Sequence, residues 1–244
     1  MQIFHRSMNT IAKVSIVGAV FFLGFLGWVA TALTSSSYST GQYVVKHQPV
    51  PFSHEHHVRG LGIDCRYCHS SVERSATAGL PPTETCMNCH RQIWTNAELL
   101  EPIRASYRDN VPVQWNRVHD LPDFVYFNHS VHVAKGIGCA SCHGKVNQMP
   151  LMFQNASLQM EWCLSCHRDP VKNVRPREEV FNIDWNPGDP ASYVKYAKQY
   201  EVPLPDGASN PHWAPSGADV AALQAKLATD YEIKSLTSCS TCHR

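Results

Sequence analysis

The longest apolar stretch of the chain lies near its N-terminus, at residues 14–33. These twenty residues carry no charge, and about 20 apolar residues in a helix are enough to span the hydrocarbon core of a membrane. Arg6 and Lys13 precede the stretch, which predicts that the N-terminus faces the cytoplasm. The pattern therefore predicts a signal-anchor helix within residues 1–34, with the rest of the chain outside the cytoplasm.

A cleaved signal peptide is the alternative interpretation of the same stretch. Residues 30–32, Ala-Thr-Ala, resemble a small-residue cleavage site. The apolar run is longer than the core of a usual signal peptide, which has about 7–15 residues. We therefore favour an uncleaved anchor in the inner (cytoplasmic) membrane.

Beyond the anchor, regular apolar spacing occurs only in short segments. A short helix is expected at residues 96–108. Another begins at Ser216, which together with Asp219 has the spacing of a capping box. Its Leu223 and Leu227 fall on one face, which we expect to pack on the core of the domain.

Residues 170–215 contain eight of the sixteen prolines of the chain, together with Asp and Gly. This composition predicts a long and mostly irregular segment. Two roles stay open for it, a simple connection between elements or a segment that wraps partners or cofactors. We call residues 170–215 the proline-rich segment.

One short motif, Cys-x-x-Cys-His, occurs five times and uses all ten cysteines. The cysteines of the five copies are Cys65 and Cys68, Cys86 and Cys89, Cys139 and Cys142, Cys163 and Cys166, and Cys239 and Cys242. The histidines that follow them are His69, His90, His143, His167 and His243. Two cysteines at this spacing can each form a thioether to one haem, and the histidine then supplies an axial ligand to the iron.

The repetition of the motif favours five covalent haem c groups over the alternatives. Zinc sites or short disulfide loops need cysteine pairs, but neither needs a histidine directly after each pair. Much of the buried apolar surface would then be porphyrin. We therefore expect a multihaem cytochrome c fold, mostly irregular with short α-helices around the haems, in a periplasmic domain at residues 35–244.

A longer pattern shows an internal duplication. Phe52-x-His54-x-x-His57 precedes the first pair of motifs, and Phe127-x-His129-x-x-His132 precedes the second pair at a nearly equal distance. The duplication predicts two di-haem modules at residues 52–91 and 127–168, followed by a fifth motif at residues 239–243.

The four histidines of the duplicated pattern are the first candidates for distal ligands. Two histidines three residues apart on a helical turn point the same way and can reach two neighbouring irons. Sequence reasoning therefore assigns His54, His57, His129 and His132 as distal ligands. We expect His56 to face solvent, and His5 would lie on the other side of the membrane.

The fifth distal ligand is predicted to be His119. The remaining candidates are His47, His212, Met149 and Met160, and a methionine would give a higher reduction potential. The supply of ligands is sufficient for five six-coordinate irons. This favours electron transfer over catalysis, because a six-coordinate iron cannot bind substrate without losing a ligand, and we expect no substrate site in this chain. The net charge of +1 gives no argument for nucleic-acid binding.

The chain resembles the ActA family, the pentahaem cytochrome c subunits of bacterial alternative complex III. The resemblance rests on the number and order of the motifs and on their flanking residues at 52–57, 118–132, 160–168 and 238–244. It implies a membrane-bound quinol-oxidising complex with an iron–sulfur subunit, polytopic quinol-site subunits and a monohaem cytochrome c. Electrons would pass through the five haems towards a cytochrome c or a terminal oxidase.

Two other functions remain as alternatives. A stand-alone quinol dehydrogenase of the NapC/NrfH type is also a single-helix multihaem protein, but its first haem typically has a methionine two residues after the motif histidine. Ser71 occupies that position here. A multihaem reductase would need an open iron, and no Cys-x-x-Cys-Lys motif occurs.

Overall fold

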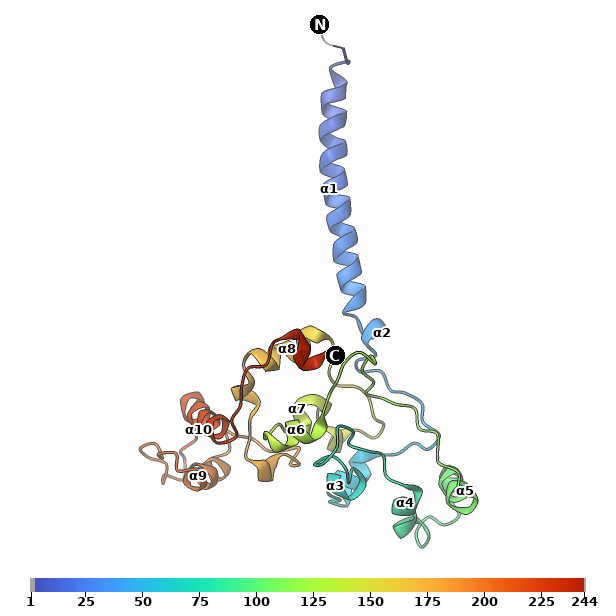
Figure 1. Cartoon of the computed structure of the whole chain (residues 1–244), viewed down its shortest axis with the longest axis vertical. Coiled ribbons are helices and arrows are strands. Elements are labelled where there is room, and N and C mark those ends of the chain that lie inside the picture. The colour runs from blue at the N-terminus through green and yellow to red at the C-terminus, as the bar shows by residue number, and fades with distance from the viewer. Residues whose placement is uncertain (1–2, 244) are drawn as a thin grey trace.

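The computed structural model describes residues 3–243 (Figure 1). One long helix projects from a body that is formed by the rest of the chain. The α-helices are α1 (Ser7–Thr34), α2 (Ser37–Thr40), α3 (Cys65–Cys68), α4 (Thr83–His90), α5 (Glu101–Asp109), α6 (His129–Ala134), α7 (Cys139–His143), α8 (Met160–Arg168), α9 (Pro190–Gln199), α10 (Gly217–Asp230) and α11 (Cys239–Cys242). A π-helix, η1 (Glu55–Gly60), and the 3-10 helices η2 (Glu98–Leu100), η3 (Val146–Gln148), η4 (Pro170–Asn173) and η5 (Arg177–Glu179) complete the order. The described residues form only isolated β-bridges and no strand.

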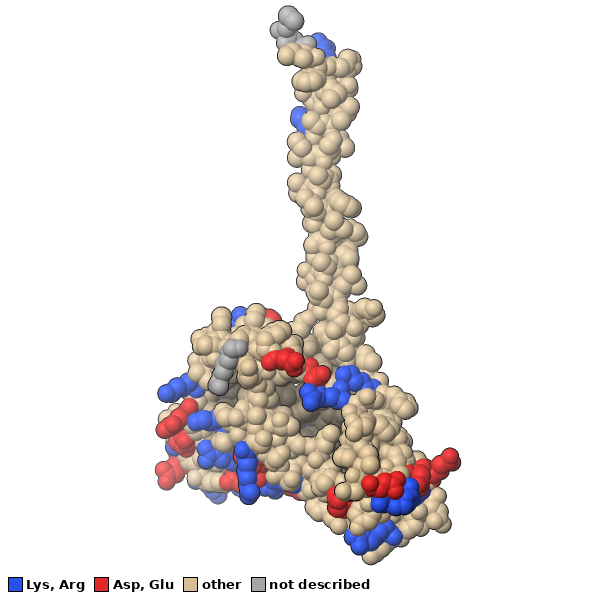
Figure 2. All heavy atoms as spheres, turned by 45° about the vertical axis from the view of Figure 1, so that its right-hand side comes forward, with Lys and Arg blue, Asp and Glu red and all other residues tan. Residues whose placement is uncertain are grey.

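Helix α1 has the composition of a membrane-spanning helix. Its most apolar window has a mean hydropathy of 2.2, and none of its residues is buried against the body. The hydroxyls of Ser15, Thr31 and Thr34 donate to main-chain carbonyls one turn earlier, which satisfies these polar groups within the helix. Figure 2 shows charged side chains gathered on the body, while the helix surface is uncharged except for basic residues near its N-terminal end.

The end of α1 is fixed to the segment around the fourth motif. Gln159, the residue before α8, donates from Nε2 to the carbonyl of Thr34 at 2.7 Å. Gln42 donates to the carbonyl of Asn155, and the buried Gln154 donates to the carbonyl of Thr40. This side of the body therefore lies next to the end of the apolar helix.

The proline-rich segment is more ordered than the sequence suggests. It contains helix α9, and Tyr193, Tyr196 and Ala197 of this helix are almost completely buried. They pack with Leu223 and Leu227 of α10 in the largest cluster of buried apolar residues. Most of the segment lies outside helices, as predicted, but residues 190–199 form a helix, because tyrosines three residues apart supply an apolar face despite the surrounding prolines.

Helix α10 agrees with its prediction. Ser216 accepts from the amide of Asp219, and the Asp219 carboxylate accepts from Ser216 in return, so the capping box is present. The apolar face packs against the tyrosines of α9. The expected helix at residues 96–108 appears as η2 followed by α5, whose Ile103 joins a second, smaller apolar cluster with Met87 of α4.

Candidate haem-binding sites

Each of the five motifs lies on a short helix. A helical turn places residues i and i+3 on one face, so the two cysteines of each motif point the same way. The cysteine pairs lie on α3, α4, α7, α8 and α11. All ten cysteines are free of disulfide bonds, and they are half-buried or exposed. Every thiol pair is therefore available for covalent attachment.

The first module holds its two candidate distal histidines against one phenylalanine. The ring of His57 stacks on Phe52 with centroids 4.4 Å apart and an interplanar angle of 22°. His54 meets the edge of the same ring at 4.9 Å and 86°. The two imidazoles thus contact the same ring differently, His57 with its face and His54 at the edge.

The second module repeats this arrangement closely. His132 stacks on Phe127 at 4.5 Å and 28°, and His129 meets its edge at 4.8 Å and 90°. The duplication seen in the sequence is therefore also a duplication of side-chain geometry. The sequence shows each phenylalanine two residues before a histidine pair, but the pattern alone gave these residues no role. Their fixed position is the signal that could have predicted this contact.

A π-helix explains how the first module keeps this geometry with one extra residue. His54 lies 11 residues before Cys65, whereas His129 lies 10 residues before Cys139. The first module has η1 after His54, while the second has the ordinary helix α6. A π-turn accommodates one residue more than an α-turn, so the insertion leaves the histidines in equivalent places.

Two pairs of histidines lie at a separation that suits one iron between them. The ring centroids of His57 and His90 are 6.3 Å apart, and those of His132 and His167 are 6.1 Å apart. Two imidazoles on opposite faces of one metal have centroids about 6 Å apart, because each metal–nitrogen bond is about 2 Å long. The interplanar angles, 66° and 65°, also match between the modules.

The other histidines of the modules gather around His143. The ring of His129 is 6.3 Å from His143 and nearly parallel to it, while His119 is only 4.3 Å away. Burial lowers the pKa of His143 to about 3, and the neighbouring His119 and His129 add to the shift. His119 therefore lies beside the third motif, and its distance from His143 is too short for two ligands on opposite sides of one iron.

His54 is the remaining histidine of the first module. Burial lowers its pKa to about 4, and His69 of the first motif is the next largest contributor. The structure thus brings His54 near the first motif, as it brings His57 near the second.

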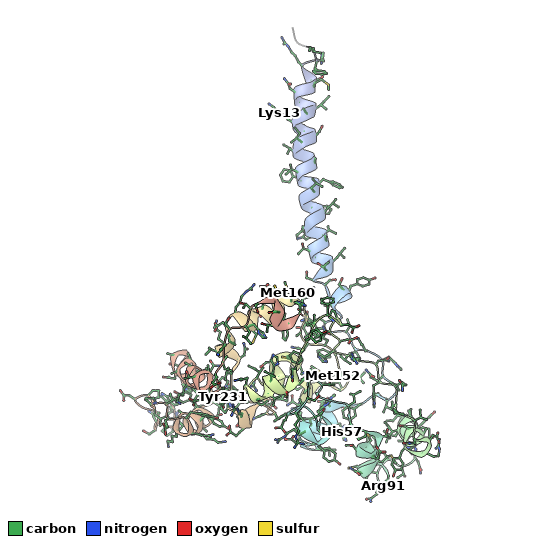
Figure 3. All side chains as sticks on the ribbon, viewed as in Figure 1. Lys13, His57, Arg91, Met152, Met160 and Tyr231 are labelled. Atoms are coloured by element: carbon green, nitrogen blue, oxygen red, sulfur yellow. The ribbon has the colours of Figure 1, made fainter. Side chains whose placement is uncertain are left out.

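The fifth motif has a different neighbour. The ring of His243 stacks with Phe124 at 5.8 Å and 28°, and no ring contact joins it to another histidine of residues 3–243. Helices α8 and α11 are adjacent, and Figure 3 shows Met160, the first residue of α8, beside this part of the body. His119 is not brought to the fifth motif.

The hydrogen bonds of the ring nitrogens suit metal-binding histidines. Six of these histidines place Nδ1 near a main-chain carbonyl: His57 with Ser53 (2.8 Å), His69 with Gly79 (2.7 Å), His129 with Ala76 (2.8 Å), His132 with Asn128 (2.7 Å), His167 with Leu236 (3.1 Å) and His243 with Phe124 (3.2 Å). A carbonyl only accepts, so Nδ1 must carry the proton, and Nε2 is then the nitrogen with a lone pair for a metal.

Buried ring nitrogens without a hydrogen-bond partner are the second indication that haems bind between these histidines. Nδ1 of His54, Nδ1 of His90 and Nε2 of His119 are buried without a hydrogen-bond partner. Burial also lowers the pKa of His119 to about 4, so its ring is neutral at neutral pH. Buried polar atoms are rarely left unpaired in a folded protein. The residues present therefore fit covalent haem c.

The five motifs lie beside one another in an order that differs from their order in the chain. Burial raises the pKa of several motif thiols, and a cysteine of a neighbouring motif is the next cause in the pairs Cys86 with Cys68, Cys139 with Cys65, Cys142 with Cys166, and Cys163 with Cys242. The spatial order is therefore second, first, third, fourth, fifth motif.

The fourth and fifth motifs lie near the apolar helix, and the second motif lies far from it. The fourth motif is on α8, directly after the Gln159 that binds the end of α1. Figure 3 shows Met160 close to the base of α1, and Arg91, the residue after the second motif, on the opposite side of the body. The series of motifs thus runs through the body from α1 outwards.

Comparisons with known proteins agree with this picture. Residues 125–183, which contain the third and fourth motifs, match the family of cytochrome c7 and related cytochrome c. This segment is a cytochrome c7-like multihaem segment. The predicted fold class is confirmed, since the described chain is helical and irregular, has no strand and begins with one apolar helix.

One relative matches a larger part of the chain. The menaquinone reductase, multiheme cytochrome c subunit, of Nitratidesulfovibrio vulgaris (strain Hildenborough) is 32% identical over 152 residues, which are 62% of this chain. The match spans 65% of that protein, slightly less than two thirds of its length. The chain is therefore similar to a multihaem cytochrome c that belongs to a quinone-linked complex.

Proposed function

We propose that the chain binds five haem c groups and transfers electrons as a subunit of a membrane quinol-oxidising complex. The observation that carries this proposal is the continuous series of five motifs, which begins beside the apolar helix and ends at the far side of the body. The haems would supply one-electron redox chemistry. The chain itself would fix their spacing, exclude water from them and tune their potentials.

The ligand assignment we propose follows the two modules. His54 serves the haem of His69, His57 that of His90, His129 that of His143, and His132 that of His167. The fit of the paired rings to one iron supports this assignment. His119, predicted as a distal ligand without a particular haem, is the competing ligand for the third haem, and Met160, at the start of α8, is the candidate for the fifth.

The membrane relationship is part of the same proposal. We propose that α1 remains as an anchor, with its N-terminus in the cytoplasm and residues 35–244 in the periplasm, where covalent haem attachment takes place. The fourth and fifth haems are then nearest to the membrane and to its quinol. Electrons enter at this end and leave from the second haem.

The partners we propose follow from two resemblances. The matched relative is a subunit of a menaquinone reductase, which supports a hetero-oligomeric complex. The likeness to the ActA family supports an alternative complex III-like quinol:electron acceptor oxidoreductase. Its other subunits would be membrane-embedded quinol-site proteins, an iron–sulfur protein and a monohaem cytochrome c, and the chain would have no substrate site of its own.

Extraction from the native membrane in mild detergent tests this proposal. The chain should co-purify in a large assembly that contains an iron–sulfur subunit and polytopic subunits, identified by sizing and mass spectrometry. A small homo-oligomer that oxidises quinol unaided would instead establish the second candidate, a stand-alone quinol dehydrogenase. The single apolar helix is the observation that favours this alternative.

A further inference from the structure

Arg175, in the loop between η4 and η5, is a buried positive charge. Only 8% of its surface is exposed, and the ion pairs of residues 3–243 do not include it. Its Nη1 donates to the carbonyls of Glu179 at 3.5 Å and Asn182 at 3.2 Å, while Nε is buried without a partner. A guanidinium stays protonated in proteins, so this charge cannot be removed by titration.

Burial lowers the pKa of Arg175, and the carboxylate of Glu179 acts to raise it but forms no ion pair with it. Glu179 binds the hydroxyl of Tyr196 and the side-chain amide of Asn182 with its two carboxylate oxygens. Its hydrogen bond with Arg175 is accepted by the main-chain carbonyl and not by the carboxylate. Cζ of the guanidinium lies over the ring of Trp185, 5.0 Å from its centroid, in a cation–π contact. Two carbonyls and a ring thus contact the cation directly, and the Glu179 carboxylate acts on it only from a longer distance.

The guanidinium lies directly against the third motif. A Cβ atom on Gly138, the residue before Cys139, would be 2.1 Å from Cζ of Arg175, so only glycine leaves room there. The amide of Cys139 donates to the carbonyl of Val180, and the amide of Arg175 donates to the carbonyl of Gly136. The loop that carries Arg175 is therefore fixed on both sides of the motif.

The first module has no equivalent of this arrangement. The position of Gly138 is taken there by Asp64, whose carboxylate caps α3 and pairs with the exposed Arg66. The first motif thus has an exposed cation with a carboxylate partner, whereas the buried cation beside the third motif has no ion-pair partner and is not a consequence of the duplication.

We propose that Arg175 raises the reduction potential of the haem attached at Cys139 and Cys142. Reduction adds one electron, supplied by a neighbouring haem, and so removes one positive charge from the haem. A fixed cation nearby favours the reduced form because it repels the more positive oxidised form. A unit charge on the order of 10 Å away, at an effective dielectric constant of about 20, changes an equilibrium constant roughly tenfold. This inference rests on the proposed haem attachment.

Potentiometric titration of the full-length, haem-loaded chain in mild detergent tests the inference. Arg175→Gln should lower one midpoint potential by about 59 mV, which corresponds to a tenfold change for a one-electron couple. Arg175→Met, also neutral, should give the same shift, and Arg175→Lys, which keeps the charge, should not. Arg177→Gln is the matched control, since Arg177 is exposed and two residues away.

Other outcomes would overturn the inference. Unchanged midpoints in both neutral variants would show that the charge does not act on a haem. An equal shift in Arg175→Lys would assign the effect to packing, and loss of haem from both neutral variants would assign Arg175 to folding. Failure of the proposed haem attachment itself would look different, because the wild-type chain would then carry no covalent haem in a haem-stained denaturing gel.

Discussion

The repeated contacts of single side chains explain how this chain prepares metal ligands before a haem is bound. A main-chain carbonyl next to Nδ1 fixes both the tautomer and the ring orientation, as it does for His57 and His132. Phe52 and Phe127 then limit the rotation of the rings from the side. The two modules reach this result with the same residue types, so equivalent substitutions should have equivalent effects.

The first prediction concerns the distal histidines. His57→Ala and His132→Ala should each convert one haem from low spin to high spin, because each removes one of two axial ligands from an iron. Electron paramagnetic resonance of the oxidised protein measures the change. His56→Ala is the control, since His56 is exposed and adjacent to His57. Five low-spin haems in both ligand variants would show that the assignment is wrong.

The second prediction concerns the phenylalanine of each module. Phe52→Leu keeps an apolar side chain but removes the stacked ring, so the imidazole planes of His54 and His57 lose their fixed orientation. We expect the haems to stay low-spin while the g values of two of them shift. Phe52→Tyr should restore the wild-type g values because it restores the ring. A wild-type spectrum of Phe52→Leu would leave Phe52 with a packing role only.

The third prediction separates the candidates for the remaining ligand. Met160→Leu should make one haem high-spin if Met160 serves the fifth haem, and the measurement is magnetic circular dichroism, which has a methionine–iron charge-transfer band. His119→Ala should leave the number of low-spin haems unchanged, because His129 is the better placed partner of His143. The opposite pair of results would restore His119 as a distal ligand.

At the scale of elements, the sequence predicts those features that depend on neighbours in the chain. The apolar run gave α1, the Ser216–Asp219 spacing gave the cap of α10, and the duplicated histidines gave two equivalent modules. Helix α9 was missed because its tyrosines are buried by residues that are distant in sequence, such as Leu223 and Leu227 of α10. The place of Arg175 was missed for the same reason, since a charged residue in a proline-rich segment is usually exposed.

The fourth prediction concerns the cap of α10. Ser216→Ala should lower the free energy of unfolding by about 1 kcal/mol, because the amide of Asp219 loses its acceptor at the helix start. Chemical denaturation followed by far-ultraviolet circular dichroism measures this. Thr229→Ala, on the exposed side of the same helix, should change the free energy by less than about 0.5 kcal/mol. Equal effects of the two changes would mean that the capping box is not important for stability.

At the scale of the whole molecule, the spatial order of the motifs is a property of packing and not of the chain order. The first motif lies between the second and the third because Cys65, the first cysteine of one module, lies close to Cys139, the first cysteine of the other. The fifth motif, last in the chain, returns to α8 near the end of α1. Long-range contacts of this kind leave no local pattern in the sequence. They nevertheless decide which haem can exchange electrons with which neighbour.

The last prediction follows from this order. Removal of the fourth haem, by Cys163→Ala with Cys166→Ala, should interrupt the series next to its membrane end. Removal of the second haem, by Cys86→Ala with Cys89→Ala, should only shorten its far end. The measurement is stopped-flow reduction by quinol in native membranes, followed at the haem absorption band. In the variant without the fourth haem, the haems of the first, second and third motifs should therefore be reduced slowly. In the variant without the second haem, the remaining haems should be reduced at the wild-type rate, whereas the rate of electron transfer to an external acceptor should fall. The reverse result would place electron entry at the second haem, on the side of the body opposite α1.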